Sequence, residues 1–223
     1  MKIINCVQGS PEWMLARAGI PTASEFHNLL TPKFEIRKGK TPETYLAQKV
    51  AERWEHGPLI GFSSFATEAG HIVEGEARSW YEFEFGETVQ TVGLVTTDDG
   101  LVGCSPDGLI GDDGGIEIKS PQSVSHVKYL QAGVVPEDYI VQLYGALYVS
   151  GRKWWNFLSY RRGYPPLLLQ VYRDDAIMKA IDSSLRDFRK KMEELYAHLV
   201  KLNGGNEPLH IPVNEPLPEG MPF

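Results

Sequence analysis

The 223-residue chain contains only two cysteines, Cys6 and Cys104. Two cysteines without a Cys-x-x-Cys spacing are too few for a disulfide framework and form no zinc or redox motif, so we expect buried free thiols. The sequence also lacks any apolar run of about 18 residues, and its first residues lack a secretory signal pattern. We therefore expect a cytoplasmic protein without a membrane-spanning segment.

Hydrolase motifs and excess positive charge are also missing. No Gly-x-Ser-x-Gly elbow is present and the six histidines are scattered, which disfavours a Ser or Cys hydrolase. The net charge of −7 is unfavourable for holding nucleic acid unless basic groups gather on one surface. Candidate groups are Lys33, Arg37, Lys38 and Lys40 in one loop and Arg152, Lys153, Arg161 and Arg162 around one predicted strand. Taken singly, each is more often part of a solvated charged turn than a DNA contact.

Helix and strand signals alternate along the chain. Helices are predicted for residues 22–30, 41–54, 67–85, 136–149 and 174–202, and strands for residues 91–97, 101–104, 116–118, 154–160 and 167–172. This alternation, in a chain of this length, predicts a single α/β domain with a central mixed sheet flanked by helices. Five prolines after residue 203 predict an extended tail, so we divide the chain into a domain of residues 1–203 and a tail of residues 204–223.

Local signals support these helix boundaries. Thr22 and Glu25 form a capping-box pattern, and Pro42 suits the first turn of the second helix. Gly86 is expected to end the third helix. Pro136 and Gly151 bracket the fourth.

Two short motifs carry chemistry, Ser105-Pro106-Asp107 and Glu117-Ile118-Lys119. The segments 101–104 and 116–118 read as strands, and the Gly- and Asp-rich residues 111–115 between them read as a hairpin loop. We therefore expect the two segments to pair, which would bring the two motifs together.

Alternation along the second strand separates its side chains. Ile116 and Ile118 should point to one face to pack, while Glu117 and Lys119 point to the other. Two neighbouring carboxylates, Asp107 and Glu117, repel each other unless a cation lies between them, and Mg²⁺ prefers such oxygen ligands. Lys119 could then hold or deprotonate a water and offset transition-state charge. The alternative is an ordinary solvated sheet face.

An ordered set of motifs extends this hypothesis. The set comprises Trp13–Gly19, Thr22–Asn28, Gly70–Glu74, Cys104–Leu109, Glu117–Pro121 and Tyr139–Gln142. In order and approximate spacing, these motifs resemble the phage lambda exonuclease group, the YqaJ-like viral recombinases of the PD-(D/E)xK nuclease superfamily. The resemblance implies a restriction-endonuclease-like nuclease core.

The resemblance assigns roles to individual residues. It implies a Mg²⁺ site, in which Mn²⁺ can substitute, held by Asp107, Glu117, the backbone carbonyl of Ile118 and Glu74. Lys119 would be the general base or water-positioning group, with Gln142 beside it. From the residues alone, Glu74 with Arg78 reads as a surface salt bridge and Gln142 as a helix-face amide.

The resemblance also implies a pocket for the 5′-phosphate of a DNA end, formed by Arg17, Ser24 and Ser105. A planar guanidinium with hydroxyl donors matches the oxygens of a terminal phosphate, and a helix start near Ser24 would add positive potential. The alternatives are that Arg17 packs its stem on Trp13 and that Ser24 merely caps a helix.

The implied activity is Mg²⁺-dependent, processive 5′-to-3′ digestion of double-stranded DNA ends, which releases 5′-mononucleotides and leaves 3′ single strands for annealing recombination. The implied assembly is a homotrimeric ring with a single-strand annealing protein as partner, in the cytoplasm of a bacterial host of a phage or prophage. Phe65 stands where family members can place a basic residue, and we hypothesise that Phe62 and Phe65 stack on unpaired bases.

Two alternative functions stay open. One is another PD-(D/E)xK nuclease, RecB-like or a restriction-type endonuclease, in which His71 joins the metal. The other is a catalytically inactive DNA-end-binding module.

Overall fold

The structure is a computed structural model that describes residues 1–59 and 68–208. For residues 68–71 it describes the backbone alone. Its helices are α1 (Pro11–Arg17), a 3-10 helix η1 (Ala23–Asn28), α2 (Lys40–Trp54), α3 (Glu68–Phe85), α4 (Ser123–Ala132), α5 (Glu137–Ser150) and α6 (Asp175–Leu202). Its strands are β1 (Lys2–Ile4), β2 (Val89–Gln90), β3 (Leu94–Thr96), β4 (Gly103–Cys104), β5 (Gly108–Ile110), β6 (Gly114–Lys119), β7 (Trp154–Ser159) and β8 (Leu167–Tyr172).

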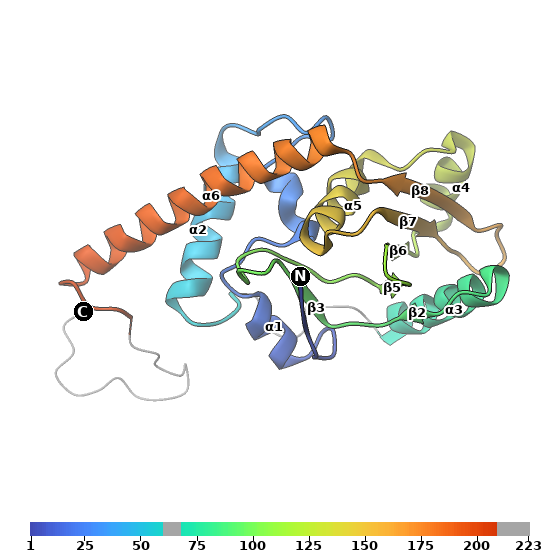
Figure 1. Cartoon of the computed structure of the whole chain (residues 1–223), viewed down its shortest axis with the longest axis horizontal. Helices are drawn as coiled ribbons and strands as arrows, with labels where there is room; N and C mark the ends of the chain where they lie inside the picture. The colour runs from blue at the N-terminus through green and yellow to red at the C-terminus, as the bar shows by residue number, and fades with distance from the viewer. Residues whose placement is uncertain (60–67, 209–223) are drawn as a thin grey trace.

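The strands form two sheets. A five-stranded sheet has the order β2-β5-β6-β7-β8 and is mixed, because β6 and β7 run parallel while its other neighbours are antiparallel. A smaller antiparallel sheet has the order β1-β3-β4. The predicted α/β domain with a central mixed sheet flanked by helices is confirmed (Figure 1).

Helices cover both faces of the five-stranded sheet. On one face Trp155 and Phe157 of β7 pack in the main core, which also takes residues from η1, α2, α5 and α6. On the other face Ile116 and Ile118 of β6 pack against Ala77 and other residues of α3. The expected alternation along β6 is therefore present, and it turns Glu117 and Lys119 toward the α5 face. The long α6 runs away from the sheet alongside α2 (Figure 1).

The predicted pairing of segment 101–104 with segment 116–118 is wrong. The hairpin partner of β6 is β5, whereas β4 pairs with β3 in the smaller sheet. Pro106 explains the change, because it has no N–H to extend a ladder and so ends β4. The side chain of Gln8 holds this break by donating to the Pro106 carbonyl at 2.8 Å. Asp107 thus precedes β5 instead of ending a strand that pairs with β6.

Only residues 94–96 of the predicted strand 91–97 form a strand, β3, and β2 (Val89–Gln90) lies before the predicted range. A Cβ at Gly93, between them, would lie 2.3 Å from the carbonyl oxygen of Cys6, so close chain packing requires glycine there. The helix predicted for residues 22–30 is a 3-10 helix instead, and the Thr22 hydroxyl donates to the Glu25 carboxylate at 3.0 Å instead of capping the main chain. β1, α1, β2, β5 and α4 were not expected from the sequence.

Other helix boundaries are confirmed. α3 ends before Gly86, and α5 begins after Pro136 and ends at Gly151, whose φ is 71°. The side chain of Asp174 caps the first turn of α6. The division into residues 1–203 and 204–223 stays a prediction, since residues 209–223 lie outside the described part of the chain.

Arg152, a predicted DNA-contact candidate, instead anchors the β5–β6 turn. Its side chain is buried, and its Nη1 atom lies 3.1, 2.7 and 2.6 Å from the carbonyl oxygens of Ile110, Gly111 and Gly114. These charge-assisted bonds hold the hairpin that carries Asp107 at one end and Glu117 on its second strand.

Replacing Arg152 with methionine is expected to lower the free energy of unfolding by about 2–4 kcal/mol, because three turn carbonyls lose their donor. Urea denaturation measures this change. Lys153→Met is the matched control, since Lys153 forms an exposed pair with Asp113 at 2.7 Å and its loss should cost less than about 1 kcal/mol. Equal losses in the two variants would contradict the anchoring role.

Candidate active site

The β5–β6 hairpin brings Asp107, Glu117 and Lys119 together. Asp107 lies just before β5, and its Oδ2 atom accepts a hydrogen bond from the main-chain N–H of Ile118 at 2.5 Å. Glu117 is buried, at 3% exposure, and its Oε1 atom lies 2.6 Å from the Nζ atom of Lys119. The acid, acid and lysine predicted from the sequence therefore share one end of the sheet.

Two side chains of α5, Gln142 and Tyr139, contact Glu117 and Lys119. Gln142 donates from Nε2 to Oε1 of Glu117 at 2.6 Å, and the Nζ atom of Lys119 lies 5.1 Å from the ring centroid of Tyr139, one turn earlier on α5. Lys119 and Gln142 thus both hold the same oxygen of Glu117. The other oxygen accepts no hydrogen bond from the residues that the structure describes.

The electrostatics of the group favour a cation. Burial raises the pKa of Asp107 well above its ordinary value, and the charges of Glu117 and Glu74 raise it further. Burial lowers the pKa of Lys119, but the charges of Glu117 and Asp107 outweigh this effect and raise its pKa overall. Lys119 is therefore an ammonium ion at neutral pH in this arrangement, which favours a water-positioning role over that of a base.

The donor set at the hairpin fits a divalent metal. Asp107 and Glu117 supply carboxylate oxygens. Ile118, which stands between Glu117 and Lys119 in the sequence, supplies a backbone carbonyl oxygen. Mg²⁺ and Mn²⁺ take such hard oxygen ligands, often with only one or two carboxylates. The mutual repulsion that raises the pKa of Asp107 is also the repulsion that a cation would relieve.

Glu74 approaches from α3 and faces a cavity of about 460 Å³ that Asp107 and Arg78 also line. Its Oε1 atom pairs with Nη2 of Arg78 at 2.6 Å, as the salt-bridge alternative expected. In the described residues, no three Asp, Glu, His or Cys side chains are arranged to hold a metal. The role of Glu74 as a further ligand stays a prediction.

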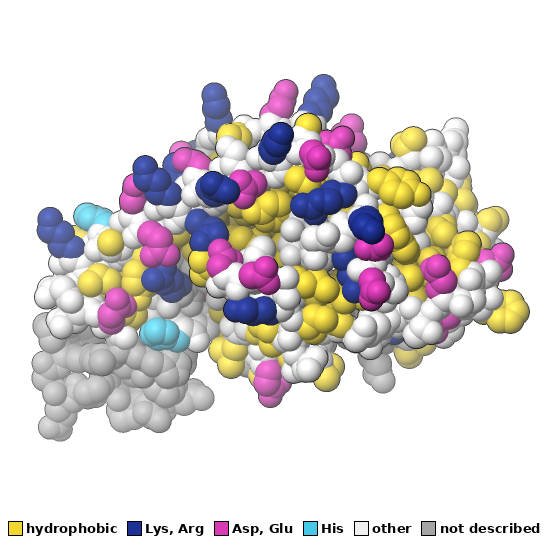
Figure 2. All heavy atoms as spheres, viewed as in Figure 1, with side chains coloured by type: hydrophobic (Ala, Val, Ile, Leu, Met, Phe, Trp, Pro, Cys, Tyr) yellow, Lys and Arg dark blue, Asp and Glu magenta, His cyan; other side chains and the backbone are white. Residues whose placement is uncertain are grey.

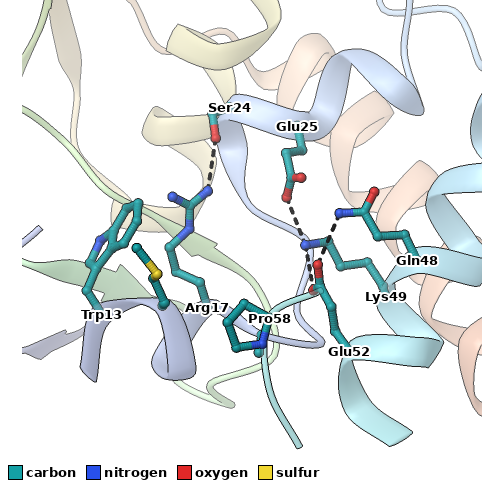
Figure 3. A pocket seen from close by; sticks show the side chains of 10 residues that line it. Trp13, Arg17, Ser24, Glu25, Gln48, Lys49, Glu52 and Pro58 are labelled. Atoms are coloured by element: carbon teal, nitrogen blue, oxygen red, sulfur yellow. Dashed lines mark hydrogen bonds and ion pairs between the residues drawn. The ribbon is translucent and has the colours of Figure 1, made fainter. Parts of the chain in front are cut away.

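A second pocket, of about 310 Å³, lies beside α1 (Figure 3). The guanidinium of Arg17 lies 4.1 Å over the ring of Trp13, and its Nη2 atom donates to the hydroxyls of Thr22 at 3.1 Å and Ser24 at 3.4 Å. Trp13 donates from Nε1 to the Ser105 hydroxyl at 2.9 Å. Arg17 and Ser24 are therefore in contact, and Ser105 joins them through Trp13. Arg17 thus packs on Trp13, the neighbour that the alternative named, but the contact is made by its guanidinium.

The opposite wall of this pocket was not predicted from the sequence. Glu25 of η1 and Gln48, Lys49 and Glu52 of α2 face Arg17 across it (Figure 3). Lys and Glu three residues apart on a helix are usually a solvated surface pair, so their pattern carried no signal of burial.

The predicted basic groups mostly bind protein atoms. Arg37 donates to the carbonyls of His27 and Leu30, Arg161 to that of Pro121, and Arg162 pairs with Glu76. Basic and acidic side chains are interspersed over the face shown in Figure 2.

None of the described helices is both long and apolar enough to cross a membrane. Phe62, Phe65 and the side chain of His71 lie outside the described residues.

A mixed sheet whose central hairpin brings Pro-Asp and Glu-x-Lys together at one end is typical of nucleases of the PD-(D/E)xK class. Residues 12–153 match the family model of the YqaJ-like viral recombinase domain, and the chain belongs to this family. The family predicted from the sequence is confirmed.

Solved structures agree with this assignment. The chain is similar to LHK-Exo, an alkaline exonuclease from Laribacter hongkongensis, with a TM-score of 0.78, 30% identity, and coverage of 88% of this chain and 99% of that chain. A second crystal structure, LHK-Exo in complex with dAMP, gives the same TM-score and coverage at 31% identity. A phage related exonuclease from Haemophilus somnus 129PT, at 12% identity and a TM-score of 0.56 over 81% of this chain and 96% of that chain, supports the fold alone. The search of curated proteins gave no match. Family and neighbours together indicate a lambda-exonuclease-like nuclease.

Proposed function

We propose that this protein is a divalent-metal-dependent exonuclease that digests one strand of double-stranded DNA from its 5′ end. It releases 5′-mononucleotides and leaves a 3′ single strand for annealing recombination. The observation that carries the proposal is the connection of two sites by Ser105-Pro106-Asp107. Ser105 accepts a hydrogen bond from Trp13 at the Arg17 pocket, and Asp107 belongs to the carboxylate group.

In this mechanism Asp107, Glu117 and the Ile118 carbonyl would hold Mg²⁺ or Mn²⁺, with Glu74 as a further candidate ligand. When bound, the cation would supply Lewis-acid polarisation of the scissile phosphate and would make water a better nucleophile. Lys119 positions the attacking water and, as an ammonium ion, offsets the negative charge that develops on the phosphate. Gln142 fixes the carboxylate of Glu117 in place through its hydrogen bond of 2.6 Å.

The Arg17 pocket gives the proposed reaction its polarity. A guanidinium stacked on Trp13, with the Ser24 hydroxyl beside it, can donate several hydrogen bonds to a terminal phosphate. A free 5′-phosphate held there presents the first phosphodiester bond to the carboxylates. Ser105 supports the tryptophan that Arg17 stacks on, and it is the third candidate phosphate ligand.

The proposed assembly follows from the family. A homotrimeric ring around duplex DNA would explain processive digestion, and it would need positive charge only along its channel, which is compatible with a net charge of −7. The proposed partner is a single-strand annealing protein in the cytoplasm of a bacterial host of a phage or prophage. The proposed nuclease domain comprises residues 1–203, followed by a Pro-rich tail of residues 204–223.

Linear duplex DNA labelled at either end tests this function. We expect digestion from 5′-phosphate ends in Mg²⁺, mononucleotide products, slower digestion from 5′-hydroxyl ends, and no digestion in EDTA. Product gels and release of labelled nucleotide measure these outcomes.

Covalently closed circular duplex is the control, because an end-dependent exonuclease leaves it intact. Cutting of the circle would favour a restriction-type or RecB-like nuclease. End binding without digestion in any divalent cation would favour an inactive end-binding module.

A further inference from the structure

A buried ion cluster lies on the wall of the pocket opposite Arg17. Lys49 of α2 is 4% exposed, and its Nζ atom lies 3.0 Å from Oε2 of Glu25 and 2.9 Å from Oε2 of Glu52. All three side chains point into the pocket region that Arg17 enters from the other side (Figure 3). A lysine this deeply buried is unusual unless its charge is paired, as it is here.

The cluster fixes the chain segment that connects Arg17 to Ser24. Glu52 accepts a hydrogen bond from the main-chain N–H of Gly19 at 3.0 Å. Glu25 accepts one from the Thr22 hydroxyl at 3.0 Å, from the residue that also accepts from Arg17. Glu52 and Glu25 are therefore both hydrogen-bonded to the segment between Arg17 and Ser24, at Gly19 and at Thr22.

The cluster also sets the charge that Arg17 experiences. Among the described residues Arg17 forms no ion pair, and the Thr22 hydroxyl lies between its guanidinium and Glu25. Oε2 of Glu25 already forms an ion pair with Lys49 and accepts hydrogen bonds from the hydroxyls of Thr22 and Tyr45, the last at 3.3 Å. Without Lys49, two uncompensated carboxylates would act on one guanidinium in a partly buried pocket, since the charges of both Glu25 and Glu52 reach Arg17.

We infer that Lys49 is a positioning residue for recognition of the 5′-phosphate: it neutralises Glu25 and Glu52 so that Arg17 stays available to a terminal phosphate. This inference rests on the proposed function. In the absence of Lys49, Glu25 turns toward Arg17 and occupies the guanidinium in place of the substrate. Preference for phosphorylated ends is then lost even though the carboxylate group at the hairpin is intact.

The test compares kcat/KM on linear duplexes with 5′-phosphate and 5′-hydroxyl ends. Lys49→Met is expected to lower the phosphate-to-hydroxyl ratio about tenfold, mainly through KM, because one charge-assisted contact is lost. Its rate on hydroxyl ends should stay near that of the wild type. Lys49→Met with Glu25→Gln is expected to recover most of the ratio, because one uncompensated carboxylate is gone.

Lys191→Met is the matched control, since Lys191 pairs with Asp187 on α6 at 2.6 Å, outside this pocket, and the ratio should not change. Should Lys49→Met fail to fold by circular dichroism and gel filtration, Glu25→Gln carries the test. This single variant keeps Lys49 and removes the acid nearest Arg17, so its ratio should equal or exceed that of the wild type. A lower ratio would overturn the inference.

Different results would contradict the proposed function and the role of Lys49. A wild-type protein that does not digest DNA, or that ignores the 5′ group, contradicts the proposed function. A wild type that prefers phosphorylated ends, together with a folded Lys49→Met variant of unchanged preference, contradicts only the role of Lys49.

Discussion

Lys119→Ala is expected to reduce digestion of linear duplex DNA by at least about a hundredfold in kcat while binding of DNA ends is retained. Lys119 is the only ammonium group at the carboxylate site in the described residues, and its Nζ atom lies 2.6 Å from Glu117. Its loss removes the group that positions water and offsets charge on the reacting phosphate. It also leaves Glu117 held by Gln142 alone.

Single-turnover digestion measures the loss in rate, and fluorescence anisotropy with labelled duplex in Ca²⁺ measures binding. Lys153→Ala is the control, because that lysine lies on the surface beside the same sheet and pairs only with exposed Asp113. Full nuclease activity in Lys119→Ala would refute the assignment of the site. Loss of binding in step with activity would instead mean that Lys119 holds the DNA.

Asp107→Asn should be nearly as damaging to activity, with an expected loss in kcat of about a hundredfold or more, because it removes one of two charged ligands from the candidate metal site. Its effect on stability should have the opposite sign. The folded state raises the pKa of Asp107 and so binds its proton more tightly than the unfolded state does. The favourable contribution of Asp107 is therefore present at acid pH and is lost as pH rises from its ordinary value through the raised folded value.

At neutral pH in EDTA, the asparagine variant should consequently melt at a higher temperature than the wild type, and the difference should shrink near pH 4. Addition of Mg²⁺ or Mn²⁺ should stabilise the wild type more than the variant, because a ligand stabilises the state that binds it. Differential scanning fluorimetry measures all three effects. A variant that melts below the wild type at neutral pH in EDTA would contradict the electrostatic account.

Asp99→Asn gives a control of opposite sign. Burial would raise the pKa of Asp99, but hydrogen bonds from Thr97 and Leu101 lower it overall. Its contribution to stability is present above the ordinary pKa and is lost as pH falls through the lowered value. Asp99→Asn should therefore lower the melting temperature at neutral pH.

The sequence predicted the parts of the fold that depend on local chemistry. Gly86 and Gly151 are helix-stop signals read within a few residues of the chain, and α3 and α5 end before them as expected. The pairing of segment 101–104 with 116–118 was wrong because strand partners depend on contacts far apart in the chain, such as that of Gln8 with Pro106.

At the candidate site, too, residues with a local sequence pattern were predicted and residues that depend on distant contacts were missed. Glu117 and Lys119 were placed on one face correctly because a two-residue period fixes the face of a strand whatever its partner is. Asp107 was placed beside them through the pairing of 101–104 with 116–118, which is wrong, and it reaches Glu117 through the β5–β6 hairpin instead. Lys49 was missed because its burial requires Glu25, which comes from a different helix, and a Lys-x-x-Glu spacing alone resembles a solvated surface. Residues whose role depends on a neighbour in space left no pattern along the chain.

The proline between Ser105 and Asp107 has one more consequence. The Cα atoms of these two residues can be at most about 7 Å apart, and Pro106 stiffens the link. If Ser105 supports binding of the DNA end and Asp107 takes part in cleavage, this short covalent link fixes the distance between the bound end and the bond that is cut. The length of each fragment, a single nucleotide at every step, would then be measured by the backbone and not by the sequence of the DNA.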